Sequence, residues 1–189
     1  MHADQNTKGF TLVEILMVIF IIGLLSVLAI AGYSEYRKIA LMNLSADSVV
    51  SQINEERENV RYGIDTQTKN VCSGIFLSST SEVSLVSVSY NPKKKWVDTD
   101  WVQGECAIDD SALSAGKKAF NTALDIQFES ASSDDAYVLF VPPDGHLLTS
   151  SSDDQIEFNM TYKNSAADKY KRTINIDLKS GNASWKYYE

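Results

Sequence analysis

A single carboxylate stands at the start of a long stretch without charge. Glu14 is followed directly by residues 15–34, twenty residues that carry no charge and are mostly Ile, Leu, Val and Ala. A carboxylate inside hydrocarbon is costly unless a positive group pairs with it. Glu14 therefore either lies at the water interface, where it costs little, or is paired with a cation from elsewhere.

The other reactive side chains do not form a catalytic or metal-binding pattern. His146 is the only histidine after His2, it follows a predicted turn, and no Ser or Cys motif surrounds it. A hydrolase needs a nucleophile and a base held together, so we expect no enzymatic activity. The aspartate pairs in the second half of the chain could suggest calcium, but EF-hand spacing is missing. We expect neither a metal nor another cofactor.

The two cysteines, Cys72 and Cys106, leave two readings open. If the domain is exported, they can pair, and closing a loop of about 35 residues would stabilise the fold by about 3–4 kcal/mol. If the domain stays reduced, they are small buried hydrophobic residues. Two cysteines at this separation and two histidines give no metal-site spacing.

The charge balance disfavours nucleic-acid partners. The chain has a net charge of -8, and from Glu35 onward 16 Lys and Arg stand against 23 Asp and Glu. An acidic domain is repelled by phosphate backbones. One basic and aromatic cluster could still bind single strands, although a solvated loop with inward tryptophans explains it as well. This cluster consists of Lys93, Lys94, Lys95 and Trp96, with Trp101 nearby.

The uncharged stretch predicts a helix that continues beyond it. Twenty residues in a helix reach about 30 Å, one hydrocarbon thickness. Residues 34–62 contain no Pro or Gly, and Gly63 is a plausible stop. This second half has an apolar stripe at helical spacing, made of Ile39, Met42, Val49, Ile53 and Val60.

The remainder predicts strands and turns. Residues 83–90, 124–128 and 156–162 alternate between apolar and polar, and residues 136–141 are apolar throughout. Residues 142–145 give a strong turn signal, and residues 174–187 read as a terminal hairpin. A short helix is expected within residues 111–123. Residues 130–135 and 150–154 are expected to form loops. The fold class is therefore α+β, a long helix followed by a mostly antiparallel sheet.

Three interpretations compete for the N-terminal segment: a secretory signal cut after Ala31, an uncut membrane anchor, and a specialised precursor sequence. The run Lys8–Gly9–Phe10–Thr11–Leu12–Val13–Glu14 and the apolar helix behind it resemble the type IV prepilin signature closely. This resemblance implies a membrane peptidase that cuts between Gly9 and Phe10 and methylation of the new amine of Phe10. It also implies that Glu14 pairs with the N-terminal amine of a neighbouring subunit and so fixes helix register in a filament.

The resemblance divides the chain into a leader (1–9), an apolar assembly helix (10–34), its amphipathic continuation (35–62) and a β-rich head (63–189). It implies partners that are other pilin subunits, the prepilin peptidase and the membrane, with the head outside the cytoplasm. Residues 137–145, 156–162, 172–176 and 180–181 also resemble minor pseudopilins of the GspH/FimT type, which serve type II secretion pseudopili or type IV pili. Residues 52–61 resemble the helix end of these proteins, which is rich in Arg and Glu. Two alternatives remain: a binding module at a filament tip, and a secreted or anchored domain without an assembly role.

Overall fold

The computed structural model describes residues 11–62, 71–78, 82–91, 96–97, 100–101, 105–122, 125–130, 135–163, 165 and 167–188. The chain divides into two compact units between Ile39 and Ala40. Helix α1 (Leu12–Tyr62) is 51 residues long and belongs to both units. We call the second unit, Ala40–Glu189, the head.

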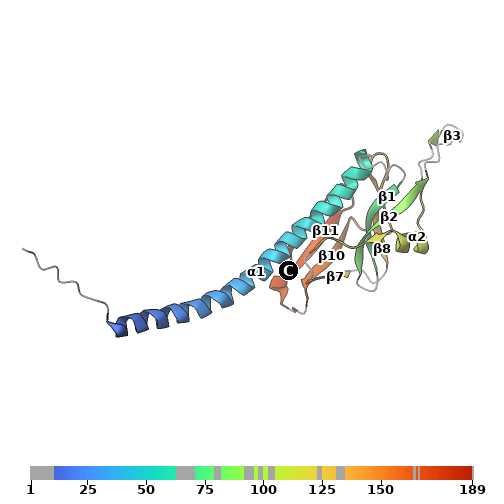
Figure 1. The fold of residues 1–189 in the computed structure, drawn as a ribbon. Coiled ribbons are helices and arrows are strands. Elements are labelled where there is room, and N and C mark those ends of the chain that lie inside the picture. The colour runs from blue at the N-terminus through green and yellow to red at the C-terminus, as the bar shows by residue number, and fades with distance from the viewer. Residues whose placement is uncertain are drawn as a thin grey trace, which may run out of the picture. The chain divides into compact units, whose positions relative to one another are not determined.

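The predicted apolar stripe of α1 is buried in the head. Ile39, just before the head, is half-buried, and the side chains of Met42, Ala46, Val49, Ile53 and Val60 are buried. They join one hydrophobic cluster with residues of the strands, among them Ile75, Val138, Phe158 and Ile174. The helical spacing seen in the sequence therefore marks the face of α1 that packs in the core (Figure 1).

Two antiparallel sheets make up most of the head. The larger sheet has the order β5–β2–β1–β8–β9, and β6 also pairs with β2. Its strands are β1 (Val71–Leu77), β2 (Val83–Asn91), β5 (Glu105–Cys106), β6 (Lys117–Lys118), β8 (Ala136–Val141) and β9 (His146–Thr149). The second has the order β12–β11–β10–β7. Its strands are β7 (Ile126–Ser130), β10 (Gln155–Tyr162), β11 (Lys171–Asp177) and β12 (Ala183–Tyr187).

The larger sheet is covered on both faces. Alternate side chains of β1 and β8 face the cluster with α1, and the others form a second cluster with Leu113 of α2 (Asp110–Ala115). A small pair, β3 (Trp96–Val97) with β4 (Asp100–Trp101), and the short 3-10 helix η1 (Asp168–Tyr170) complete the elements described. The α+β class is confirmed.

Several predicted elements are found at the expected residues. Strand β8 covers residues 136–141, the turn occupies residues 142–145, and the hairpin of β11 with β12 closes the chain. Gly145 has a φ of 70° and donates its N–H to the carbonyl of Val141 at 2.9 Å, a backbone conformation that favours glycine. The loop at residues 150–154 also lies where expected.

Other expectations differ from the structure. The helix expected within residues 111–123 ends at Ala115, because Gly116 and β6 run close to β2. A Cβ on Gly116 would lie 2.1 Å from the carbonyl oxygen of Ser87, so this approach requires glycine. Strands β1 and β9 were not expected at all. The expected helix stop at Gly63, the strand position Leu124 and most of the loop at residues 130–135 lie outside the described residues.

Candidate functional site

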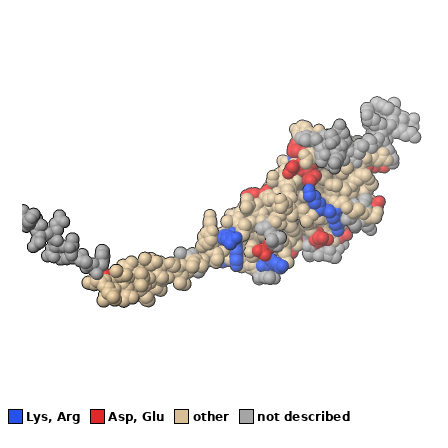
Figure 2. All heavy atoms as spheres, in the orientation of Figure 1, with Lys and Arg blue, Asp and Glu red and all other residues tan. Residues whose placement is uncertain are grey.

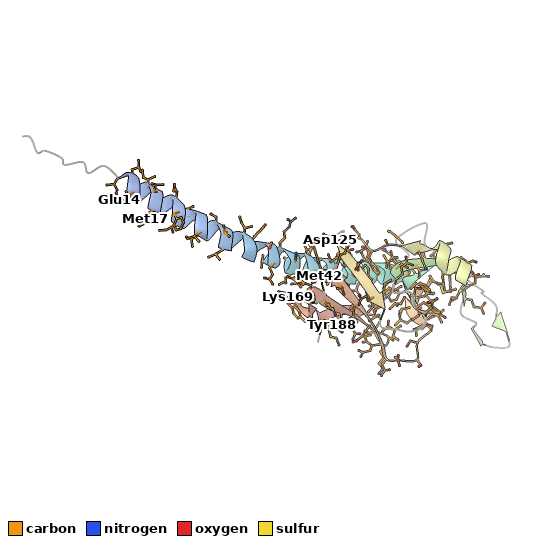
Figure 3. All side chains as sticks on the ribbon, turned by 90° about the horizontal axis from the view of Figure 1, so that it is seen from below. Glu14, Met17, Met42, Asp125, Lys169 and Tyr188 are labelled. Atoms are coloured by element: carbon orange, nitrogen blue, oxygen red, sulfur yellow. A yellow bond between two sulfur atoms is a disulfide. The ribbon has the colours of Figure 1, made fainter. Side chains whose placement is uncertain are left out.

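The first turn of α1 holds Glu14 through Thr11. The backbone N–H and the hydroxyl of Thr11 both donate to Glu14 Oε2, at 2.9 and 3.0 Å. The N–H of Glu14 donates in turn to the hydroxyl oxygen of Thr11 at 3.3 Å. This reciprocal pattern is a capping box, in which residue types Thr-x-x-Glu satisfy free N–H groups at a helix start. Local chemistry therefore begins α1 at Leu12 and fixes the position of the carboxylate (Figure 3).

The apolar side chains after Glu14 are exposed. From Leu12 to Ile30 the large apolar side chains are between 52% and 75% exposed. Figure 2 shows this part of α1 as a surface almost free of charge beyond its first turn. Among the helices described, α1 alone is long and apolar enough to cross a membrane. An apolar surface of this extent requires lipid or other protein to cover it.

One side of this helix is slightly hollowed. Leu16, Phe20 and Val27 surround Gly23 there, and a Cβ on Gly23 would meet no other atom within 4 Å. Small residues on an apolar helix allow another helix to approach closely. The segment can therefore receive either lipid chains or the apolar face of another helix.

The predicted cleavage site and most of the predicted basic cluster lie outside the described residues. Gly9, Phe10, Lys93, Lys94 and Lys95 lie outside the described residues. Trp96 is described by its backbone, which pairs with Trp101 between β3 and β4. Of the residues predicted to act in processing and assembly, Glu14 lies within the described part of the chain, where it contacts Thr11.

Cys72 and Cys106 are joined in a disulfide. Cys72 lies in β1 and is fully buried, and Cys106 lies in β5, opposite Tyr90 of β2. The disulfide connects strands on either side of β2. It therefore holds together the strands from which the segment with β3 and β4 extends, since this segment runs from β2 to β5.

His146 begins β9 directly after the predicted turn. Its Nδ1 lies 2.7 Å from Asp144 Oδ1. The hydrogen bond from His146 holds the pKa of the Asp144 carboxyl below its usual range, more than burial raises it. Within the described ranges, no three His, Cys, Asp or Glu side chains gather in a group that could hold a metal ion.

A set of polar contacts between α1 and the last hairpin was missed in the sequence. Arg172 of β11 is 1% exposed, and its Nε and Nη2 donate to Asn43 Oδ1 at 2.9 and 2.6 Å. Burial lowers the pKa of the guanidinium from its ordinary value. The sequence did contain a signal, because Arg172 has the same strand parity as Ile174 and Ile176, which are buried.

The remaining contacts follow the same line along α1. Trp185 Nε1 donates to Asp47 Oδ1 at 2.7 Å, and the N–H of Ala183 donates to Asn54 Oδ1 at 3.2 Å. Further along, Arg57 Nη1 donates to Asn182 Oδ1 in the hairpin turn. The contacts of Asn43, Asp47, Asn54 and Arg57 fasten β11, β12 and the turn between them to the helix.

Comparison with known proteins gives one match. Residues 4–30 match the family model described as the prokaryotic N-terminal methylation motif. This range includes Thr11, Glu14 and most of the exposed apolar helix. No curated protein and no solved structure matches the chain.

Proposed function

We propose that this type IV pilin-like precursor is a minor pilin or pseudopilin, a structural subunit cut between Gly9 and Phe10 and assembled through α1. The filament would be a type IV pilus or a type II secretion pseudopilus. The observation that carries the proposal is the methylation motif at residues 4–30, which lies on an exposed apolar helix. Before assembly, lipid covers this helix in the inner membrane. Afterwards, the helices of other subunits cover it.

The first turn of α1 suits this change of surroundings. Cleavage would leave a positive amine on Phe10, four residues before Glu14. Both donors of Thr11 bind Glu14 at Oε2, so Oε1 can accept the amine of a neighbouring subunit. A carboxylate that is capped and paired in this way is neutralised inside the apolar filament core.

The assignment to minor subunits rests on the head. The segments of the head that resemble the GspH/FimT type lie in β8 with its turn, in β10, in β11 and in the turn after β11. They are residues 137–145, 156–162, 172–176 and 180–181. Subunits of this kind are structural and carry no enzymatic site. After cleavage, the head would lie in the periplasm or on the cell surface as part of a filament.

The first experiment expresses the full-length chain in a host that has a prepilin peptidase and determines its mature N-terminus. Intact mass and terminal sequencing should give a start at Phe10 with a methylated amine. Gly9→Leu should remain uncut, because a larger side chain does not fit where glycine is cut. A start at Gly32, or an uncut chain with native Gly9, would contradict the proposal.

Assembly is tested separately from processing. Glu14→Gln keeps an oxygen that can accept both hydrogen bonds of Thr11, but it removes the charge. We expect it to be cut normally and to be lost from purified filaments. Thr11→Ala is the matched control, since it removes both hydrogen bonds of the Thr11 hydroxyl and leaves the carboxylate with the Thr11 N–H. Equal incorporation of Glu14→Gln and the native chain would show that charge pairing at this position is not needed.

A further inference from the structure

The last hairpin runs along α1 in a fixed direction. Its turn contacts Arg57 through Asn182, and its open end contacts Asn43 through Arg172. Trp185 with Asp47 lies between these points. The open end of the hairpin is therefore at the end of the head where α1 enters it, near residue 40.

Aromatic and basic side chains gather at this open end. Lys171 Nζ lies 4.7 Å from the ring centre of Tyr188, and Lys169 Nζ lies 5.1 Å from that of Tyr170. The Arg172 guanidinium lies 4.4 Å from the ring of Tyr187, which is 61% exposed. We call the exposed or half-exposed members of this group the hairpin patch; they are Lys169, Tyr170, Lys171, Tyr187 and Tyr188.

The position and charge of the hairpin patch set it apart from the rest of the head. Figure 3 shows Lys169 and Tyr188 at the same end of the head as Met42 of α1. Residues 168–172 contain three basic side chains, of which Arg172 is buried, and one acidic one, Asp168, whose Oδ1 lies 3.4 Å from Lys171 Nζ. The chain from Glu35 onward has 16 basic and 23 acidic residues. The patch is thus a local positive area on an acidic domain.

We infer that the hairpin patch lies in the headgroup layer of the bilayer that anchors α1, with its tyrosines among the headgroups and its lysines on lipid phosphates. Tyr and Trp are enriched at this depth, and basic side chains bind anionic headgroups. Asn43 is only nine positions after Ser34, the end of the apolar stretch. Nine residues span about 14 Å in a helix and at most about 32 Å extended. This inference rests on the proposed anchoring of α1.

The test places the full-length chain in vesicles of phosphatidylcholine with or without phosphatidylglycerol. A photoactivatable group on the lipid headgroup labels what it touches, and mass spectrometry locates the label. We expect label on peptides that contain residues 169–171 and 187–188, and more label with phosphatidylglycerol. In anionic vesicles, the double variant Lys169→Glu, Tyr188→Ser should carry at least about fivefold less label than the native chain. This factor corresponds to the electrostatic attraction that one lysine near a membrane surface contributes.

Two controls show whether a loss of label comes from lost lipid contact at the hairpin patch. One excludes unfolding of the variant, and the other excludes a general effect of losing any lysine. Lys169→Glu keeps the backbone carbonyl to which Arg172 donates, and an unchanged melting midpoint by circular dichroism would show that the variant is folded. Lys179→Glu changes an exposed lysine at the turn end of the same hairpin. It should leave the labelling of the patch unchanged.

A second probe with its reactive group on the acyl chain reports on α1 alone. Acyl-chain label within residues 15–34, together with no headgroup label on the hairpin patch, would overturn the inference and leave the anchoring intact. Crosslinks from the patch to a second copy of the chain, in place of lipid, would also overturn it. A third result would overturn it as well. This is binding of a single-stranded oligonucleotide that the double substitution abolishes without changing lipid labelling. Absence of acyl-chain label on α1 would count against the proposed function itself.

Discussion

Replacing Arg172 tests how the head holds the helix. The side chain is 1% exposed, and no acidic side chain is among its hydrogen-bond partners in the described part of the chain. Nε and Nη2 donate to Asn43 Oδ1, and Nη1 donates to the carbonyls of Lys169 and Lys171 at 3.1 and 2.6 Å. One guanidinium thus joins α1, η1 and β11.

The expected magnitude follows from these acceptors. Arg172→Met keeps an apolar stem and removes every donor. Each buried acceptor left without a donor costs about 1–3 kcal/mol. Asn43 is half-buried, and its side chain can turn to water. The cost therefore comes mainly from the carbonyls of Lys169 and Lys171. The variant no longer buries a cation, and the desolvation cost that it avoids offsets part of this loss. We expect the free energy of unfolding to fall by about 2–4 kcal/mol.

Lysine at the same position separates charge from geometry. Arg172→Lys keeps the charge, but an ammonium cannot present the fixed fork of donors that reaches three acceptors. We therefore expect Arg172→Lys to be at least as destabilising as Arg172→Met. Asn43→Ala combined with Arg172→Met should show a coupling of about 1–2 kcal/mol, since the two residues are in direct contact.

The assay is urea unfolding of the full-length chain in detergent, followed by circular dichroism and by tryptophan fluorescence. Trp185 lies 5.6 Å from the guanidinium, so its emission reports on the site directly. Lys179→Met is the control, because Lys179 is exposed on the same hairpin, and it should change stability by less than about 0.5 kcal/mol. A stability for Arg172→Met equal to that of the native chain, or a milder effect of Arg172→Lys than of Arg172→Met, would refute the reasoning.

Three further predictions concern the head and the helix. Gly74→Ala should prevent folding, because a Cβ there would lie 1.9 Å from the carbonyl oxygen of Val138; Gly32→Ala, with open space around it, should be tolerated, and the yield of folded protein compares the two. Reduction of the disulfide, which joins residues 34 apart, should lower the free energy of unfolding by about 3–4 kcal/mol, measured by urea unfolding with and without dithiothreitol; equal midpoints would contradict this. The Ser180 hydroxyl holds the pKa of Asp177 below its usual range. The carboxylate therefore stabilises the fold above its unfolded pKa of about 3.9, and this contribution is lost as the pH falls through the lower folded pKa. Stability measured against pH should fall less steeply in acid for Asp177→Asn, and parallel curves would contradict the role of this carboxylate.

The sequence predicted those elements whose pattern has a single buried face. The stripe of α1 and the alternation of β10 and β11 each mark one side that packs in the core. Strand β1 has six buried residues in succession because sheets and helices cover both of its faces. It shows no alternation, and Gly74 in its middle argues against a strand. Strand β9 is short, half-buried and directly follows a turn, so its pattern is equally weak.

The site divides in the same way. The N-terminal motif is local, so its residues could be recognised from their spacing, and the capping box links residues only three apart. The contacts of Arg172 with Asn43 join residues 129 positions apart. Sequence spacing contains no information about such a pair. The parity of Arg172 with Ile174 could have indicated a buried charge, but not the partner that satisfies it.

The polar contacts explain how the helix keeps its register on the sheets. An apolar stripe repeats every three or four residues, so a shift of one turn would again place apolar side chains on apolar side chains. The same shift moves each polar group by about 5.4 Å along the helix, which breaks hydrogen bonds of 2.6–3.2 Å. Asn43, Asp47, Asn54 and Arg57 would all lose their partners together. A force along the part of α1 within the head is therefore resisted by the terminal hairpin. The proposed assembly of the subunit through its helix would need this resistance.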